Sequence, residues 1–478
     1  MKKYIKIIFY VFSIILVIGC ATQFTYYSNL KNFLSSEEYT KADALIEENK
    51  FKEYGEKNAL LYWMDKGIVL HYARRYEDSI LAFEKAEKLA EELYTKSISE
   101  EAATFLISDN AKAYYGEDFE RIFINVFQSL NYLFLNKYED ALVEARKVDH
   151  KLKTLQVDYG GKNVYKEDAF MRYLTGLLYE SQNEINDAYV SYAKSLREYE
   201  TNNKIYDFEI PKDLIFRNLR VAKRLGFKEE FDTINKKFNL NINYKDIVDD
   251  KNTGELILFH YNGFAPYKID HYIEVTFGEG WVYVGSIKVE GDAQKDVQKA
   301  RQIARGIASN EQFLVAFPKF VPSHSKIKYG VLDILNENKE KIFSQKTFLV
   351  EDIEKIAIKN LEDRITKIRV KAIARAAIKY ALSRAVSQKL TEKSDDLSKW
   401  LVTKALQTAS TATEQADKRS WRTLPKQIML ATATLKPGRY SLELKFYDEQ
   451  NNFIMKKEIG NINILNGKKT FISVRTYL

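Results

Sequence analysis

The stretch Lys66-Gly67-Ile68-Val69-Leu70-His71-Tyr72, followed after three residues by Tyr76-Glu77-Asp78, decides the fold because its pattern recurs between residues 58 and 198. Each copy has a small residue, then Tyr-Glu-Asp or a near copy of it, then small and aromatic residues at helical spacing. The copies are Trp63, Gly67, Tyr76-Glu77-Asp78, Ser79, Phe83 and Ala86; Ser129, Tyr132, Tyr138-Glu139-Asp140, Ala141, Ala145 and Val148; and Gly176, Tyr179, Asn186-Asp187-Ala188, Tyr192 and Ser195. This self-similarity predicts paired helices that stack, because one pair cannot bury its own apolar face.

The pattern resembles the tetratricopeptide (TPR) repeat, in which small residues lie where two helices cross and large ones lie between them. We therefore expect an α-helical repeat array over residues 29–238, with a concave surface that holds another polypeptide. Superposing the copies predicts the side chains that face this groove, and the partner-binding candidates are His71, Tyr72, Phe134, Tyr173 and Glu180. Plain packing between helices is the alternative for each of them.

The amino terminus has the pattern of a secretory signal over residues 1–19, with three lysines followed by the apolar run Ile7 to Ile18. Val17-Ile18-Gly19-Cys20 resembles the lipobox of bacterial lipoproteins, which implies cleavage before Cys20 and acylation of its thiol and new amino group. An uncleaved anchor is the alternative, but the run is shorter than the roughly 20 residues that a spanning helix needs. Ala21 after the cysteine implies, by the same resemblance, sorting to the outer membrane. Residues 20–28 would then form a tether.

Composition is that of a folded globular protein, with 45% apolar and 29% charged residues. The formal net charge of +8 falls to +5 once the three lysines of the signal are removed, so the charge does not point to nucleic acid. Cys20 is the one cysteine in the sequence, so no disulfide is expected within the chain. At 478 residues the chain is long enough for two or three domains, each with its own core.

The period changes from helical to alternating at Gly254, after a polar linker at residues 239–253. We expect an α+β multidomain protein in which the repeat array precedes a β-rich, sandwich-like domain at 254–350. A helical insertion at 351–419 would interrupt that domain, and strands in 420–478 would complete it. The expected strands are Leu256–His260, Tyr272–Phe277, Trp281–Val289, Phe313–Phe317, Lys326–Leu332, Ile342–Leu349, Tyr440–Tyr447, Phe453–Leu465 and Lys469–Tyr477, with a helix at Gln294–Ser309.

Two shorter segments of this half also carry a local signal. Val370–Ala381 is rich in alanine with interspersed lysine and arginine, so it is a candidate for docking on anionic lipid or simply a helix packed on the sheet. Asn466-Gly467 is a strong signal for a hairpin between the last two strands, because both residues tolerate positive φ.

No catalytic constellation is evident in the sequence. The five histidines lack the spacing of a helical zinc site. A hairpin that brought His260 and His271 together would still lack a third ligand, so the sequence favours structural roles for the histidines. Phosphate-binding loops and nucleophile elbows are absent from the sequence. We therefore expect no metal, no cofactor and no enzymatic activity.

The chain resembles a family of bacterial TPR-containing outer-membrane lipoproteins. The resemblance rests on the lipobox, the first two repeat copies, Asn262-Gly263-Phe264-Ala265-Pro266 and Asp417-Lys418-Arg419-Ser420-Trp421-Arg422-Thr423-Leu424-Pro425. Genes of that family often lie near lipoproteins similar to the Lpo-type activators of penicillin-binding proteins, which implies a role in the cell envelope. Its Trp-x-x-Leu-Pro segment is matched by Trp421, Leu424 and Pro425, a candidate docking site or the entry to the last strands.

The sequence therefore favours a lipid-anchored periplasmic adaptor whose array binds a protein partner. The family resemblance implies a neighbouring envelope lipoprotein as a candidate for that partner. The alternative is a peptidoglycan- or glycan-binding lipoprotein that uses aromatic side chains near Trp281, Tyr283 and Trp421. An enzyme of unrecognised type is the third hypothesis, and it would need convergent carboxylates with perturbed pKa values in a cleft.

Overall fold

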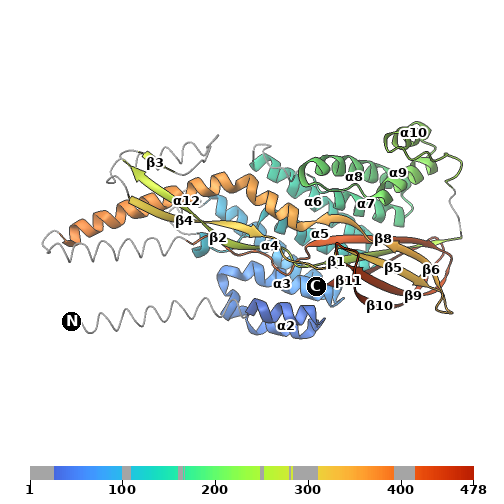
Figure 1. Cartoon of the computed structure of the whole chain (residues 1–478), viewed down its shortest axis with the longest axis horizontal. Helices are drawn as coiled ribbons and strands as arrows, with labels where there is room; N and C mark the ends of the chain where they lie inside the picture. The colour runs from blue at the N-terminus through green and yellow to red at the C-terminus, as the bar shows by residue number, and fades with distance from the viewer. Residues whose placement is uncertain are drawn as a thin grey trace.

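The computed structural model describes residues 26–99, 109–159, 165, 167–247, 252–278, 281–283, 311–391 and 415–477 (Figure 1). Cys20, most of the strand expected at Trp281–Val289 and the helix expected at Gln294–Ser309 lie outside these residues. Helices make up the first half of the described chain and strands most of the second, so the mixed α+β class predicted from the sequence is confirmed.

Consecutive helices of the first half pair as hairpins, α3 with α4, α5 with α6, α7 with α8 and α9 with α10. A Cβ added to Gly67 of α3 would lie 2.5 Å from the Phe83 ring, and one added to Gly176 of α7 would lie 2.3 Å from the Tyr192 ring, so both crossings require glycine. The helices are α2 Tyr39–Glu48, α3 Ala59–Tyr72, α4 Tyr76–Ser99, α5 Asp118–Phe134, α6 Tyr138–Asp158, α7 Ala169–Ser181, α8 Ile185–Tyr206, α9 Lys212–Arg224 and α10 Lys228–Lys237, with short helical turns η1 Lys50–Tyr54, η2 Glu56–Asn58 and η3 Asp109–Ala111.

Five helix turns of the described chain close with the same backbone hydrogen bonds. The residue two positions before the second helix has a positive φ of 58–77° in Glu37, Arg74, Asn136, Asn183 and Gly226. In each turn the next N–H donates to the carbonyl five residues earlier, at 2.8–2.9 Å. These are Schellman motifs, which satisfy carbonyls at the end of a helix. The repetition extends from residues 26–35, which are helical, to α10.

The described strands form three sheets, with orders β11-β1-β8-β7, β10-β9-β5-β6 and β3-β2-β4. In the first sheet β1 runs parallel to β11 and antiparallel to β8, so strands from the end of the chain flank a strand from its middle. The strands are β1 Gly254–Asn262, β2 Tyr267–Gly278, β3 Trp281–Tyr283, β4 Glu311–Val321, β5 Tyr329–Leu335, β6 Lys341–Lys346, β7 Phe348–Asp352, β8 Gln427–Leu435, β9 Gly438–Tyr447, β10 Phe453–Ile464 and β11 Lys469–Thr476.

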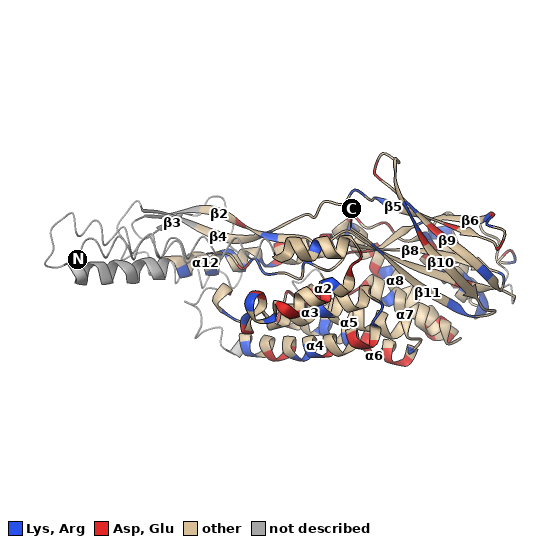
Figure 2. Ribbon diagram, turned by 90° about the horizontal axis from the view of Figure 1, so that it is seen from below, with Lys and Arg blue, Asp and Glu red and all other residues tan. Residues whose placement is uncertain are grey.

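Strand β1 lies at the centre of a three-layered body and is buried along its whole length. Its alternating side chains point in opposite directions. Ile257, Phe259 and Tyr261 join the core shared with the helices, whereas Leu256 and Leu258 join the core shared with the second sheet. The helices therefore cover one face of the first sheet, and the second sheet covers the other (Figure 2).

The third sheet and the long helix α12 (Ile353–Thr391) extend away from this body and are called the arm (Figures 1 and 2). Helix α12 packs along β4, where the Arg369 guanidinium lies 5.8 Å from the centre of the Phe317 ring. Within the described residues no helix has the length and apolar character that crossing a bilayer demands.

Several sequence expectations about strands need correction. Strand β8 was not predicted. The segment expected as one strand at Ile342–Leu349 is divided into β6 and β7 at Thr347, whose hydroxyl accepts a hydrogen bond from the Gly330 N–H at 2.8 Å. Asn466-Gly467 forms a turn, but not a hairpin, because β11 pairs with β1 in the first sheet while β10 belongs to the second.

Candidate functional site

The five side chains predicted to face a partner groove share the inner face of the helices, and that face is covered by the chain's own strands. His71, Tyr72, Tyr173 and Glu180 are buried, and Phe134 is partly buried. The Phe134 ring lies 5.7 Å from the Phe259 ring of β1. The expectation of an open groove at these positions is therefore corrected, because the first sheet fills it.

His71 connects α3 to both a neighbouring helix and the sheet. Its Nδ1 lies 2.6 Å from Oδ1 of Asn131 in α5, and its Nε2 lies 3.1 Å from the hydroxyl of Tyr261 in β1. Burial lowers the pKa of His71 to about 4, so the imidazole is neutral at physiological pH. The residue is therefore a structural bridge in this arrangement.

The candidate docking segment Trp421, Leu424 and Pro425 is also buried, against the same helices. Residues 415–426 run along the inner face, and the Trp421 ring lies 5.8 Å from Phe83 and 6.5 Å from Phe127. The Tyr72 hydroxyl donates to the Thr423 carbonyl at 3.1 Å. The segment is thus docked within its own chain, in the place where a bound peptide was expected.

Two buried carboxylates hold this segment. Glu120 accepts the Trp421 N–H at 2.6 Å, and Asp65 accepts the Thr423 hydroxyl at 2.5 Å. Burial raises the pKa of Asp65 to about 6, and burial together with the nearby charge of Glu117 raises the pKa of Glu120 to about 7. The sequence did not single out either acid, because each lies among other carboxylates on a helix.

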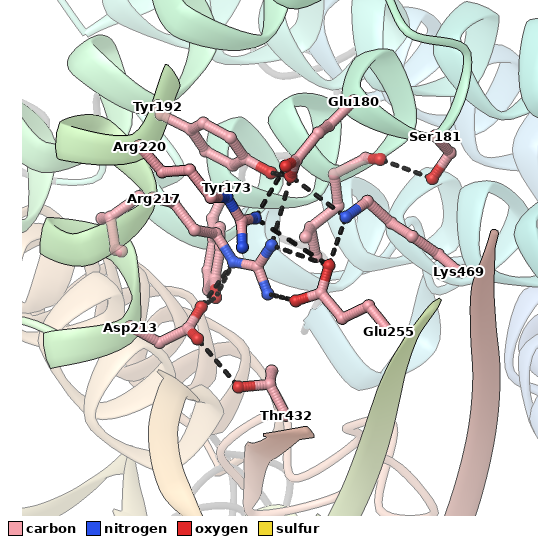
Figure 3. A network of polar contacts seen from close by, with 12 residues as sticks. Tyr173, Glu180, Ser181, Tyr192, Asp213, Arg217, Arg220, Glu255, Thr432 and Lys469 are labelled. Carbon is pink, nitrogen blue, oxygen red and sulfur yellow. Dashed lines mark hydrogen bonds and ion pairs between the residues drawn. The ribbon is translucent and has the colours of Figure 1, made fainter. Parts of the chain in front are cut away.

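A second set of contacts between helices and sheet is ionic (Figure 3). Arg217 of α9 is only 2% exposed, and it donates to Glu180 of α7 at 3.1 Å, to Asp213 at 2.5 Å and to Glu255 of β1. Lys469 of β11 pairs with both Glu180, at 3.2 Å, and Glu255. These residues are called the ionic cluster.

Further contacts bind the ionic cluster to its surroundings. Arg220 pairs with Glu180 at 2.6 Å, Tyr173 donates to Asp213, and the Thr432 hydroxyl of β8 donates to Asp213 at 2.8 Å. Three cations thus face three carboxylates. Although burial alone would raise it, the pKa of Glu255 is lowered to about 2 by Arg217 and Lys469, so its carboxylate is ionised.

The base of the arm lies beside the start of the described chain. The Arg422 guanidinium lies 4.6 Å from the centre of the Tyr27 ring and 5.4 Å from that of Tyr267, the first residue of β2. Glu117, at the start of α5, pairs with Lys268 of β2 and Arg364 of α12. The arm is therefore paired at its base with Glu117 and lies, through Arg422, beside Tyr27.

The histidines do not form a metal site in the described parts of the chain, where no group of three or more suitable ligands was found. His260 is buried in β1, and its Nε2 lies 2.8 Å from the Thr476 hydroxyl. His271 is exposed in β2, a strand of a different sheet, so these two histidines do not meet across a hairpin.

Comparison with known proteins adds little to this geometry. No family model and no curated protein matches the chain. Among solved structures the chain is similar to one titled "Crystal structure of BtubC (BKLC) from P. vanneervenii", with 15% identity over 44% of this chain and 74% of that chain, at a TM-score of 0.31. A likeness this weak carries no argument about function.

Proposed function

We propose that this chain is a lipid-anchored scaffold on the periplasmic face of the outer membrane that binds a protein partner in cell-envelope assembly or cell-wall synthesis. In this proposal the inner face of a TPR-type array holds the chain's own β-rich, sandwich-like part in a fixed position. The partner then contacts the arm, since the groove residues are already engaged within the chain.

The repeat assignment is supported by local geometry that recurs along the helices. Gly67 packs on Phe83 and Gly176 packs on Tyr192, at the same separation in sequence. In the first copy the Ser79 hydroxyl donates to the Gly67 carbonyl at 2.7 Å, and between the equivalent positions of the second copy the Ser129 hydroxyl donates to the Ala141 carbonyl at 2.9 Å. Together with the shared Schellman turns, these contacts are what helix pairs of one repeated unit would make.

The observation that carries the proposal is the contact of Arg422 with both Tyr27 and Tyr267. Cys20 is seven residues before Tyr27, and a fully extended chain spans about 3.5 Å per residue. A lipid on Cys20 would therefore hold the base of the arm within about 25 Å of the membrane surface. Several acyl chains together give stable anchoring, whereas one would not.

The anchoring step is tested by replacing Cys20 with serine and fractionating cells. We expect the wild type in the outer-membrane fraction and the Cys20→Ser variant either unprocessed in the inner membrane or released. Equal recovery of both proteins from the outer membrane would rule out anchoring through Cys20.

The partner step is tested by incorporating a photo-crosslinking amino acid at Tyr272, which is 54% exposed on β2. The matched control is Phe51, which is 85% exposed on the helical body. We expect a discrete crosslinked protein from Tyr272 in intact cells and none from Phe51. Crosslinking from Phe51 alone would assign the partner to the body.

The glycan-binding alternative loses one of its three aromatic residues, because Trp421 is 1% exposed and packs inside the chain. Sedimentation with isolated peptidoglycan distinguishes the two functions. Cosedimentation that depends on Trp281 or Tyr283 would favour the alternative.

A further inference from the structure

Two cations lie close together at the base of the arm, on the side that meets the start of the described chain. Tyr27 and Lys31 are one turn apart in the helical residues 26–35, so they share a face of that helix. Arg422 lies over the Tyr27 ring, and the Nζ of Lys31 lies 4.7 Å from the centre of the Phe264 ring. Burial and, after it, the charge of Arg422 lower the pKa of Lys31 to about 8, so each cation lies within the field of the other.

This pair of cations has no carboxylate partner in the described parts of the chain. Lys31 and Arg422 contact aromatic rings, and neither forms an ion pair or a hydrogen bond with another described residue. The charge of Arg422 acts on Asp65, yet this carboxylate is fully buried and accepts hydrogen bonds from Thr423 and Tyr54. Cations that are partly removed from water are normally paired, so the excess positive charge at this point calls for an anion.

Both side chains remain accessible to a ligand. Lys31 and Arg422 are each partly exposed. The Nε of Arg422 is buried, but its two Nη groups are not, so the outer end of the guanidinium faces solvent. The rings of Tyr27 and Tyr267, whose centres lie 4.6 and 5.4 Å from the guanidinium, hold it in place. The site therefore offers two Nη groups and one ammonium group as donors.

We propose that Lys31 and Arg422 together bind a phosphate group. A phosphate carries oxygens on several faces, so it can accept hydrogen bonds from the guanidinium and from the ammonium at the same time. A carboxylate has two oxygens in one plane, which the guanidinium alone would satisfy. The phosphate belongs either to a lipid headgroup or to a soluble ion. The lipid source rests on the proposed function, because Cys20 is seven residues before Tyr27 and its acylation would bring the site near lipid headgroups.

The site is tested by titration calorimetry of the purified full chain at about pH 5.5, where inorganic phosphate carries mainly one negative charge, as acetate does. We expect inorganic phosphate to bind saturably and at least about fivefold tighter than acetate, because only phosphate engages both cations. Acetate binding as tight as phosphate binding, or an absence of saturable phosphate binding, would overturn the assignment.

The source of the phosphate is tested with glycerophosphoglycerol, the water-soluble headgroup of phosphatidylglycerol, which also carries one negative charge. Saturable binding of this diester in competition with inorganic phosphate supports a lipid source. Binding of inorganic phosphate alone supports the phosphate site and contradicts the lipid source. A Cys20→Ser chain should bind both ligands as the wild type does, because Cys20 is not part of the site. Loss of anchoring and loss of phosphate binding are therefore separate results.

Two variants locate the site. Lys31→Gln removes one of the two cations and should weaken phosphate binding about tenfold. Arg422→Gln removes two of the donors and should weaken binding at least as much. Lys52→Gln, at an exposed position of η1, is the matched control and should bind as the wild type does. Lys31 is partly exposed, so its variant should fold even if Arg422→Gln does not. Unchanged phosphate affinity in the folded Lys31→Gln chain would contradict the proposal.

Discussion

The two ends of the interface between helices and sheet are built from different chemistry. At α3 and α5 most of the contacts are apolar and aromatic, with Trp421 and Tyr261 packed among ring side chains, and Asp65 and Glu120 add hydrogen bonds to residues 415–426. At α7 and α9 the contacts are the ionic cluster around Arg217. Burial of apolar surface stabilises without regard to direction, whereas buried ion pairs return little net stability but penalise every wrong pairing. The aromatic end therefore supplies stability, and the ionic end fixes which strands lie on which helices.

The largest expected effect tests the aromatic end. Trp421→Ala should lower the free energy of unfolding by an amount near the upper end of about 3–5 kcal/mol, because a fully enclosed indole leaves a cavity. The measurement is urea denaturation. Trp63→Ala, at a partly exposed position on α3, is the matched control and should lose clearly less. Similar losses in both variants would show that docking of residues 415–426 adds no stability.

The ionic end is tested by Arg217→Met. Removal of this side chain leaves Glu180, Asp213 and Glu255 with too few cations in a buried setting, which should cost about 3–5 kcal/mol. Arg224→Met, at the exposed end of α9, should change the denaturation midpoint little. Conversely, replacing the cluster as a whole with apolar residues should recover much of the loss. A wild-type denaturation midpoint in Arg217→Met would show that the ionic cluster does not matter for the stability of this end of the interface.

The contribution of the aromatic end to the free energy of unfolding should depend on pH, because Glu120 titrates there. The pKa of Glu120 is about 7 in the folded protein against an ordinary 4.5, so the folded state holds this proton more tightly. Its stabilising contribution is complete below pH 4.5 and is lost as the pH rises through 7, by up to about 3 kcal/mol.

The lowered pKa values of His71 and His260 act in the opposite direction, with stability gained as the pH rises toward 6.5. The informative quantity is therefore the difference between wild type and Glu120→Gln in denaturation at pH 5 and pH 8. We expect that difference to change with pH, and Glu84→Gln, at an exposed position of α4, is the matched control. A constant difference for Glu120→Gln would show that this carboxyl titrates normally.

The smallest expected losses of stability come from changes inside the helix hairpins, since each end of the interface contains such a hairpin. Gly67→Ala and Gly176→Ala each place a Cβ within 2.5 Å of an aromatic ring, so each should cost about 1–3 kcal/mol. Gly226→Ala meets no atom within 4 Å and tests only the positive φ, at a cost of about 1 kcal/mol. If the losses of unfolding free energy in Gly67→Ala and Gly176→Ala differ by more than about 2 kcal/mol, which is the width of that expected range, the two hairpins are not equivalent units.

The sequence predicted the helices and most strands because their periodicity is local. Helix pairs from Ala59 to Arg224 follow from small and aromatic residues at fixed spacing. Strand β8 was missed because Ile428–Ala433 is buried on both faces and therefore lacks the alternation of a half-exposed strand.

The occupant of the groove could not be predicted from the sequence. His71 and Tyr261 are 190 residues apart, and no local pattern indicates that their rings meet. The same repeat positions would face the inner surface whether a partner or the chain's own sheet lay on it. For the same reason, no local pattern in the sequence indicates that Arg217 and Lys469 both pair with Glu180 and Glu255.

The most direct test of the central claim, that residues 415–426 occupy the inner face of the helices, is amide hydrogen exchange of the intact chain. The Trp421 N–H donates to the buried Glu120 at 2.6 Å, so its exchange should be slowed to the level of the Ile257 and Phe259 amides in β1. Exchange of the Trp421 amide at the rate of an unstructured peptide, in a chain whose β1 amides remain protected, would contradict the account.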